Sequence, residues 1–323
     1  MSLDSYESIF QQFPSVSAEE WKNKIIKDLK GESFDKLIWH SKEDIEVLPF
    51  YTKEDNEKYQ LQVPLKQTSS WQITERVLVD DITSANKVAL HALQNGATSI
   101  TFNLQNKSFN KEQIEFLVRD ILIDIAPVTF EDYTEEDKVI LETVVKDSCP
   151  LTIYTEQRDS ISDELAAALK KGIQQSNSNL RFHFYCTQNY FFEIAKLRAF
   201  RWLWKQVCEL KKQPYHIFIQ SETNSKKFSA DDEYSNILRN TTAAMSAILG
   251  ACDGLIINSH DTLIGESNFG KNIARNIHHI LQHESYFNDI VDAAKGSYYI
   301  EYLTYQLSKK SWGKLSESGF ARL

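Results

Sequence analysis

Residues 181–220 read RFHFYCTQNYFFEIAKLRAFRWLWKQVCELKKQPYHIFIQ. The aromatic run at 181–185 predicts a strand, and the apolar side chains at three- and four-residue steps over 190–212 predict a helix. A second strand is predicted at 216–220. A strand, a helix and a strand in this order are typical of a parallel βαβ unit, so this stretch indicates an α/β fold.

The same alternation extends over the chain from residue 70 onward. Seven strands fit a TIM-type (β/α)8 barrel, shortened or degenerate, better than an open sheet. An eighth strand either lies near Tyr298–Glu301 or is missing. The other predicted strands cover 71–77, 99–104, 128–130, 151–154 and 254–258, and the other predicted helices cover 84–94, 111–125, 134–147, 162–174, 235–250 and 270–284.

The segment before the barrel has a different character. We divide the chain into an N-terminal arm, residues 1–65, and a barrel domain, residues 66–323. Ser17 followed by Glu20 predicts a capping box at the start of a helix that Gly31 ends. The helix at 190–212 has two apolar faces and must be covered on both. The barrel covers one face, and either a neighbouring chain or this arm is expected to cover the other.

Composition and charge exclude several classes of protein. The net charge of -9 argues against binding to nucleic acid or to an anionic membrane, because both need a basic surface. The four cysteines contain no CxxC pair, so neither a metal-thiolate site nor a disulfide framework is expected. The start, Met1-Ser2-Leu3-Asp4, lacks a secretory signal, and no apolar run is long enough for a bilayer. A cytoplasmic protein is therefore expected.

Three local motifs resemble known ligand-binding or catalytic patterns, but none of them is complete. Residues 265–272, GESNFGKN, nearly form a phosphate-binding loop, but Asn272 replaces the required Ser or Thr. His279 and His283, with His278 beside them, have metal-ligand spacing without a third ligand, so a solvated helix face is expected and no metal. The adjacent residues of Ser259-His260-Asp261 cannot form a catalytic relay.

Three separated blocks together resemble one enzyme family. They are FFEIAKLRAFRWLW at 191–204, IARN at 273–276 and GSYYIEYLT at 296–304. These blocks resemble methylmalonyl-CoA mutase, the cobalamin-dependent isomerase of acyl-CoA thioesters, and more closely its small subunit. The resemblance implies a heterodimer with a large mutase subunit, which the arm would contact. The expected partner-contact residues are Tyr51, Phe200, Trp202 and Trp204.

The residues that this family uses for chemistry are mostly missing. Its Arg-Gln-Tyr-Ala-Gly-Phe segment is replaced at 71–77, where the chain reads WQITERV, and no Gly-Tyr-His occurs. Its barrel-top motif survives in part as Asn258 and Asp261, with Ile256 and Thr262 at the histidine and glutamate positions. As an alternative, Asp261 caps the following turn. No catalytic residue is assigned, and the C-terminal cobalamin-binding domain with its Asp-x-His-x-x-Gly motif is expected to be absent.

The resemblance therefore implies a non-catalytic subunit. This chain would support a large subunit that binds adenosylcobalamin and converts the acyl-CoA substrate, while binding no cofactor itself. Two alternatives remain open. One is a stand-alone acyl-CoA-binding module, which would need clustered Lys or Arg at the barrel mouth. The other is a barrel enzyme of unrecognised chemistry, for which Asp261 and His260 are the candidates.

Overall fold

The computed structural model describes residues 16–146, 149–156, 158, 160–175 and 180–320. The N-terminal residues on which the absence of a secretory signal rests lie outside this range, as does residue 147 at the end of one predicted helix. Two compact units divide the chain, Met1–Lys58 and Tyr59–Leu323. Within the described residues, no helix is both long enough and apolar enough to cross a membrane.

The first unit begins with the predicted capping box. The Ser17 side chain accepts a hydrogen bond from the Glu20 main-chain N–H at 3.2 Å, and the Glu20 carboxylate accepts one from the Ser17 N–H at 2.8 Å. These bonds satisfy two main-chain donors at the helix start, which is why the helix begins here. The elements of this unit are α2 (Ala18–Asp28), the 3-10 turn η1 (Phe34–Leu37), the antiparallel pair β1 (Trp39–His40) and β2 (Glu46–Val47), and α3 (Lys53–Tyr59), which ends at the unit boundary.

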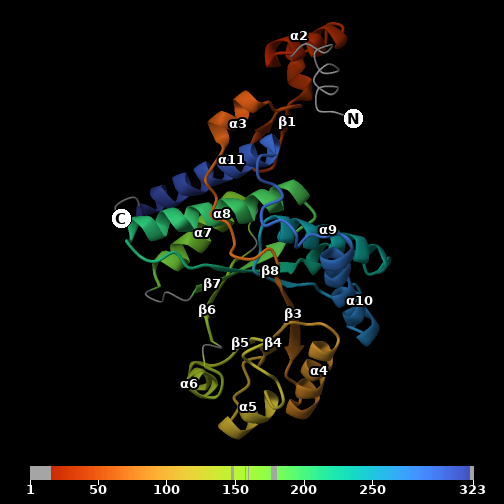
Figure 1. The fold of residues 1–323 in the computed structure, drawn as a ribbon, viewed down its shortest axis with the longest axis vertical. Helices are drawn as coiled ribbons and strands as arrows, with labels where there is room; N and C mark the ends of the chain where they lie inside the picture. The colour runs from red at the N-terminus through yellow and green to blue at the C-terminus, as the bar shows by residue number, and fades with distance from the viewer. Residues whose placement is uncertain (1–15, 147–148, 157, 159, 176–179, 321–323) are drawn as a thin grey trace, which may run out of the picture. The chain divides into compact units, whose positions relative to one another are not determined.

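The second unit is a ring of parallel strands with helices outside it (Figure 1). The order of strands is β5-β4-β3-β9-β8-β7-β6. The strands are β3 (Gln72–Leu78), β4 (Ser99–Asn103), β5 (Val128–Glu131), β6 (Leu151–Tyr154), β7 (Leu180–Cys186), β8 (Phe218–Thr223) and β9 (Gly254–Ile256). The helices are α4 (Ile82–Gln94), α5 (Lys111–Leu117), α6 (Glu135–Val144), α7 (Ile161–Ile173), α8 (Tyr190–Leu210), α9 (Ser235–Leu249), α10 (Asn268–His279) and α11 (Tyr298–Leu315), with short turns η2 (Ser225–Lys227), η3 (Ile280–Glu284) and η4 (Ser316–Phe320).

The ring is incompletely closed at two places. β3 pairs with β9 through only two residue pairs, Gln72–Gly254 and Ile73–Leu255. β5 and β6 are the two ends of the strand order and are not paired with each other. The fold is thus α/β, with a seven-stranded parallel sheet in a shortened, open TIM-type barrel, as the sequence predicts.

The prediction that an eighth strand could lie near Tyr298–Glu301 was wrong. These residues form the first turn of α11, which follows the positive-φ residue Gly296. Ile300, Leu303 and Leu307 are buried at three- and four-residue spacing. The period of the apolar side chains is therefore helical, and the run of β-prone tyrosines obscured it.

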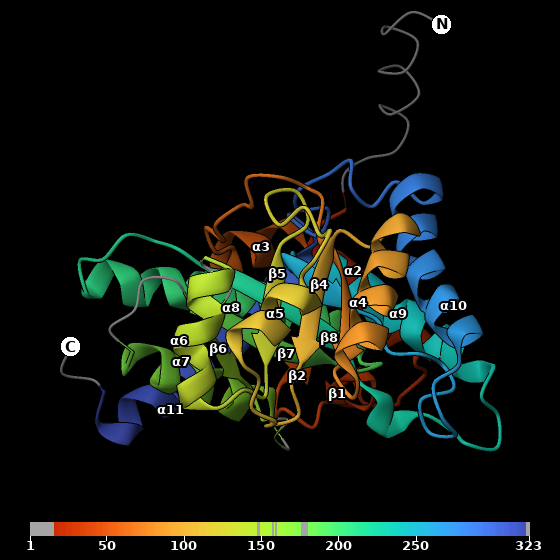
Figure 2. The same ribbon diagram turned by 90° about the horizontal axis from the view of Figure 1, so that it is seen from below.

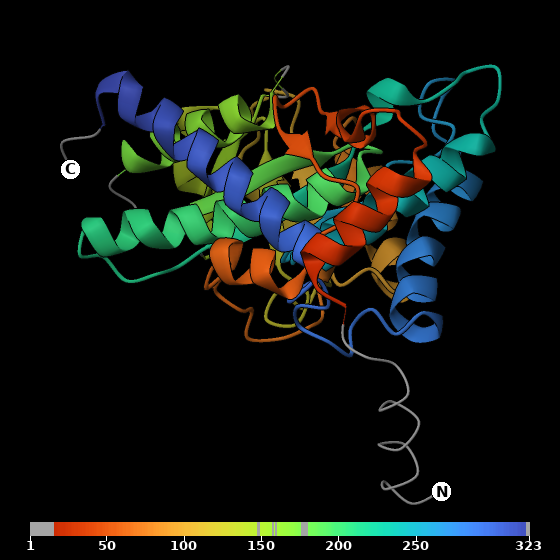
Figure 3. The same cartoon turned by 90° about the horizontal axis from the view of Figure 1, so that it is seen from above.

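Helix α8 is covered on two sides, as its two apolar faces predict. Phe200 packs edge-on against Phe182 and Phe184 of β7, with ring centroids 4.7 and 4.8 Å apart. Helices α7, α9 and α11 also pack against α8, and α11 lies alongside it (Figure 3). Because α11 supplies the second cover, neither a neighbouring chain nor the arm is needed there.

The barrel interior is polar where TIM barrels are usually filled by branched aliphatic side chains. Thr74 and Ser99 share a hydrogen bond of 2.8 Å between neighbouring strands, and Thr101 and Thr129 share one of 3.0 Å. The alternate residues of the same strands join the apolar core with the outer helices; α4 and α5 lie against this side of the sheet (Figure 2). Thr74, on this polar interior face, also lines the cavity at the mouth of the barrel.

Candidate functional site at the barrel mouth

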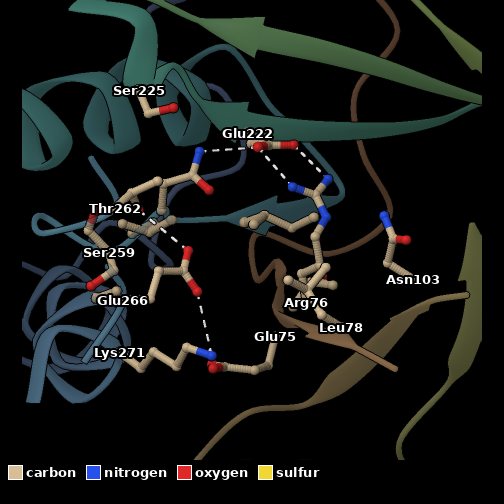
Figure 4. Close-up of a pocket in the computed structure, with 15 residues that line it drawn as sticks. Glu75, Arg76, Leu78, Asn103, Glu222, Ser225, Ser259, Thr262, Glu266 and Lys271 are labelled. Atoms are coloured by element: carbon tan, nitrogen blue, oxygen red, sulfur yellow. Dashed lines mark hydrogen bonds and ion pairs between the residues drawn. The ribbon is translucent and has the colours of Figure 1, made fainter. Parts of the chain in front are cut away.

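A cavity of about 340 Å³ lies at the carboxyl ends of β3, β4, β8 and β9 (Figure 4). This end of a TIM-type barrel is where active sites of the fold are built. Its walls carry two cationic and three carboxylate side chains. The lining residues used below are Thr74, Glu75, Arg76, Leu78, Glu222, Asn258, Ser259, Thr262, Glu266 and Lys271.

Arg76 bridges two carboxylates across this mouth. Its Nε donates to Glu131 Oε1 at 2.5 Å, and its Nη1 and Nη2 donate to the two oxygens of Glu222 at 2.8 and 2.6 Å. The two glutamate side chains are each 5% exposed. A bidentate guanidinium–carboxylate pair of this kind is among the strongest polar contacts in proteins. The positive charge of Arg76 is therefore fully engaged within the chain.

Three further side chains extend the network to the remaining strands. The Tyr154 hydroxyl donates to Glu131 Oε2 at 2.8 Å, and His183 Nε2 lies 2.9 Å from Glu222 Oε2. The Asn258 amide donates to Glu222 Oε1 at 3.0 Å. Side chains from β3, β5, β6, β7 and β8, and from Asn258 two residues after the end of β9, thus meet in one hydrogen-bonded group.

The charge states of Glu222 and Tyr154 are fixed at neutral pH. Burial favours the neutral form of Glu222, but the hydrogen bond from His183 and the charge of Arg76 outweigh it and hold the pKa of this carboxyl below its usual range. Burial, together with the neighbouring charge of Glu131, raises the pKa of the Tyr154 hydroxyl. Glu222 remains a carboxylate and Tyr154 a phenol, so neither exchanges a proton readily near pH 7.

The same contacts bridge both openings in the ring of strands. Tyr154 on β6 bonds to Glu131 on β5, the strand with which β6 does not pair. Arg76 on β3 reaches past the short β9 to Glu222 on β8. The side chains therefore hold together strands that main-chain hydrogen bonds leave apart.

The two barrel-top candidates predicted from the sequence are both placed at this mouth. Asn258 lines the cavity and donates to Glu222 and to the Thr223 carbonyl. Asp261 lies behind it and accepts from Ser259 Oγ and from the Ser267 N–H, at 3.1 Å for the latter. Ser267 caps the start of α10, so Asp261 holds the turn that leads into this helix. Burial opposes its charge, yet the bonds from these two serines lower the pKa of Asp261.

Residues 259–261 form no catalytic relay, as expected from their adjacency. Ser259 Oγ donates directly to the Asp261 carboxylate. The imidazole of His260 lies instead between the rings of Tyr234 and Phe269, with centroid distances of 5.7 and 6.1 Å. His260 is 3% exposed, and its Nδ1 has no hydrogen-bond partner among the residues that the structure describes. The imidazole stacks on the Tyr234 ring and meets the Phe269 ring edge-on, and it takes no part in the contact between Ser259 and Asp261.

The expectation of a solvated histidine face on α10 was wrong for His278. Its imidazole is 2% exposed, and its Nδ1 accepts a hydrogen bond from Trp71 Nε1 at 3.0 Å. Burial lowers the pKa of His278 to about 3. His278 is buried one turn from Ala274 and Leu281, at helical spacing, while Ile280 points outward at 47% exposed. No cluster of three metal-binding side chains occurs among the described residues.

The predicted partner-contact residues have different environments. Phe200 is fully buried, and Trp204 is 5% exposed, with its indole N–H donating to the His216 carbonyl at 2.9 Å. Both side chains pack within this chain and are not available at its surface. Trp202 is partly exposed and lines a hollow of about 470 Å³ between α8 and α11. In the first unit, the Tyr51 hydroxyl accepts a hydrogen bond from the Leu48 N–H.

Comparison with known proteins agrees with the blocks identified in the sequence. The methylmalonyl-CoA mutase family model matches residues 163–318. The methylmalonyl-CoA mutase small subunit of Porphyromonas gingivalis is 27% identical over 390 aligned positions, covering 95% of this chain and 63% of that protein. The chain belongs to the methylmalonyl-CoA mutase family.

Two further relatives define how far the family likeness extends. The small subunit of Streptomyces virginiae is 24% identical, over 96% of this chain and 64% of that protein. A methylmalonyl-CoA mutase of Rhizobium meliloti is 32% identical, over 63% of this chain and 32% of that protein. The chain thus spans less than two thirds of the length of these relatives. A solved dipeptide epimerase from Methylococcus capsulatus gives a TM-score of 0.31 at 14% identity, covering 60% of this chain and 56% of that one, a likeness too weak to bear on function.

The region matching the mutase family contains buried ion pairs that sequence analysis missed. Arg198 of α8 donates to Glu301 of α11 at 2.8 Å and also contacts Asp292. Arg201, one turn along, donates to Asp253 at 2.6 Å. The Arg198–Glu301 pair joins two of the three family blocks, the one in α8 and the one that opens α11. The blocks that carry the resemblance therefore maintain packing.

A third cation of α8, Lys196, is also buried and paired with carboxylates. Lys196 is 1% exposed and lies 2.6 Å from Glu193 and 3.6 Å from Glu164, with a hydrogen bond to the Tyr185 carbonyl. Burial alone would lower the pKa of Lys196, but the charges of Glu164 and Glu193 raise it. The sequence did offer a signal for these buried ion pairs: Lys196, Arg198 and Arg201 recur at steps of two and three residues along an otherwise apolar helix. Cations buried in such a helix need carboxylate partners.

The mutase family is cobalamin-dependent, and the mouth of this barrel does not fit that cofactor. Asn258 and Asp261, which the sequence predicts as barrel-top candidates, are both engaged by neighbours in the chain. His260 is enclosed by aromatic rings, and His183 is bound to Glu222. No Asp-x-His-x-x-Gly motif occurs in the sequence to supply a cobalt ligand. No step of the isomerisation can be assigned to these residues.

Proposed function

We propose that this chain is the non-catalytic small subunit of a methylmalonyl-CoA mutase. It supports a large, cobalamin-binding subunit that interconverts methylmalonyl-CoA and succinyl-CoA. Similarity to two small subunits along nearly the whole chain supports this assignment. Because the chain spans less than two thirds of those relatives, their activity and partners enter as part of the proposal.

The observation that carries the proposal is the engaged state of Arg76. An acyl-CoA thioester bears several phosphate charges, and a site for it needs cations with free hydrogen-bonding capacity. Arg76 is instead neutralised by Glu131 and Glu222. The cavity wall also holds Glu75 and Glu266 against the single further cation Lys271. The surplus of negative charge opposes acyl-CoA, which disfavours the alternative of a stand-alone acyl-CoA-binding module.

We assign the partner contacts to surfaces that remain apolar and accessible. The hollow between α8 and α11 is lined by Trp202, Leu210 and Trp312, and Leu210 is 51% exposed. In the arm, which we place at residues 1–65, Trp21 and Trp39 are 53% and 51% exposed, and Tyr51 lies in the same unit. Large apolar surfaces of this kind are typical of obligate subunit interfaces. Adenosylcobalamin would be held by the large subunit.

Co-expression with a large methylmalonyl-CoA mutase subunit tests the proposal. This chain carries the only affinity tag, and isomerisation is assayed with added adenosylcobalamin. We expect the large subunit to co-purify with activity, while this chain alone neither turns over substrate nor binds the cofactor. Isomerisation by this chain alone, or failure to retain a large subunit, contradicts the proposal.

A further inference from the structure

The hollow between α8 and α11 follows two helices that lie side by side (Figure 3). Its volume is about 470 Å³. On α8 the lining residues recur at four-residue steps from Trp202 to Leu210, a distance of roughly 12 Å, or about two turns of helix. The side chains that matter most for recognition are Trp202, Gln206 and Leu210 of α8 and Ser308, Lys309 and Trp312 of α11.

The chain's own linker after α3 already packs beside this hollow. Leu61 lines it, and the Tyr59 ring packs against the rings of Tyr302 and Tyr305 on α11, with centroids 5.0 and 5.3 Å apart. Beyond the linker, Leu210 is 51% exposed. This face of α11 therefore accepts apolar side chains, and part of the hollow beside it stays open.

Ser308 contributes a buried hydroxyl that lacks a partner. The residue is 2% exposed and lines the hollow, and its Oγ makes no hydrogen bond with any residue that the structure describes. On the same helix, the hydroxyls of Thr304 and Ser311 each donate to the carbonyl four residues earlier, at 2.7 Å. Ser308 does not make this bond, and an unpaired buried hydroxyl destabilises a free chain. It marks the place where an occupant supplies a hydrogen-bonding group.

The charges around the hollow favour an acidic occupant. Lys309 is exposed and is the one charged side chain found among the described lining residues. Glu209, next to Leu210, lies 3.7 Å from Lys205, so this pair adds no net charge at the rim. A carboxylate on the occupant would therefore find Lys309 without competition from a carboxylate in the lining.

The shape and chemistry of the lining select a helix rather than an extended peptide. Most of the lining is aromatic or aliphatic, as at Trp202, Leu210 and Trp312. An extended segment would leave main-chain N–H and C=O groups unpaired against these side chains, whereas a helix pairs them internally. A hollow between two packed helices also receives the apolar stripe of a third helix.

We propose that two turns of an amphipathic helix of the large subunit lie in this hollow. Apolar side chains of that helix, three and four residues apart, pack on Trp202 and Trp312, one polar side chain bonds to the Ser308 hydroxyl, and one carboxylate pairs with Lys309. This inference rests on the proposed function and deepens it, because it names the kind of segment that the large subunit contributes.

A pair of serine variants tests the role of the buried hydroxyl. Ser308→Ala should bind the purified large subunit about three- to tenfold more weakly, while the thermal midpoint of the free chain stays unchanged or rises, because no bond is lost in the free chain. Ser311→Ala is the matched control, and it should lower the thermal midpoint and leave the affinity unchanged, because its hydroxyl bonds within α11. A Ser308→Ala variant that binds as tightly as the native chain overturns the proposal.

A pair of charge reversals tests the acidic character of the occupant. Lys309→Glu should weaken binding by about three- to tenfold at low salt, and the loss should shrink as salt is added. Lys87→Glu, on the exposed side of α4, is the control and should leave the affinity unchanged. Equal affinities of the two variants mean that no carboxylate lies at Lys309, which overturns the proposal.

Photo-crosslinking identifies the occupant and separates the two proposals. With p-benzoylphenylalanine in place of Leu210, the cross-linked peptide should come from the large subunit and carry apolar residues at three- and four-residue steps together with Asp or Glu. A cross-link to a second copy of this chain, or to a segment without that pattern, overturns the assignment. Size-exclusion chromatography shows whether a complex forms at all. A complex without this cross-link overturns only the hollow assignment, and absence of any complex overturns the proposed function as well.

Discussion

Replacing Arg76 by methionine should destabilise the barrel by an amount that depends on pH. The Arg76 side chain is 22% exposed, and the two carboxylates that it bridges are each 5% exposed. Removing one partner of a buried ion pair costs about 3–5 kcal/mol, because the other charge stays buried without compensation. The partial exposure of Arg76 places Arg76→Met near the lower end, about 3 kcal/mol at pH 7.

The sign of the pH effect follows from the pKa of Glu222. In the native chain the pKa of Glu222 is lowered from its ordinary value of 4.5. The network therefore stabilises the fold fully at pH values above 4.5, and this contribution is lost as the pH falls through the pKa of Glu222 in the folded chain. Without Arg76, burial raises the carboxyl pKa values, and the variant loses stability as the pH rises. The difference between native and variant chains should therefore shrink to about 1–2 kcal/mol at pH 4.

Urea denaturation at pH 7 and pH 4 measures both differences. Arg119→Met is the matched control, since Arg119 is exposed and its guanidinium lies over the Phe116 ring at 4.2 Å. This control should cost less than about 1 kcal/mol at either pH. If Arg76→Met costs no more than the control, or costs the same at both pH values, the network does not hold the strands of the open barrel together.

Three further predictions concern packing, titration and thiol reactivity. A Cβ on Gly270 would overlap the side chains of Ser259 and Asp261, whereas one on Gly313 in α11 meets no atom of the described residues within 4 Å. Thermal unfolding should therefore show Gly270→Ala less stable by about 1–3 kcal/mol and Gly313→Ala more stable by about 0.5–1 kcal/mol. Because the pKa of His278 falls to about 3 on folding, the free energy of unfolding should decrease by about 2 kcal/mol between pH 7 and pH 5. His278→Gln retains an acceptor for Trp71 and should remove that decrease in urea titrations. An unchanged decrease would refute the burial argument. All four cysteines are buried, and burial raises the pKa of the Cys252 thiol to about 12. Ellman's reagent should therefore react rapidly with none of them in the native chain and with all four in denaturant. Fast labelling of the native chain would contradict this packing.

The parts of the fold that could be predicted from sequence are those set by local periodicity. Strand Leu151–Tyr154 and the start of α8 at Tyr190 have the predicted bounds. The capping box at Ser17 is also as predicted. The run Tyr298–Glu301 was ambiguous because its β-prone tyrosines hide a helical apolar stripe. Local composition and period compete there, and the buried stripe decides.

The candidate site could be predicted only in part, because its contacts join distant residues. Asn258 was identified from its position after a strand, and it does line the cavity. Arg76 and Glu222 are 146 positions apart, and nothing in either neighbourhood indicates their pairing. The sequence did contain one indirect signal, since charged residues occur on strands that also carry buried apolar side chains. Which of these charged residues pair with one another becomes clear only from the order of the strands in the sheet.

The ion pairs of α8 and α11 have a consequence for how this family is recognised. Arg198 and Glu301 occupy blocks that anyone comparing sequences would take as a signature of the mutases. In this chain Arg198 and Glu301 join α8 to α11, so the signature at these positions records a packing contact. A match at these positions therefore reports how the helices pack. The chemistry of a family member has to be judged from the residues that line its barrel mouth.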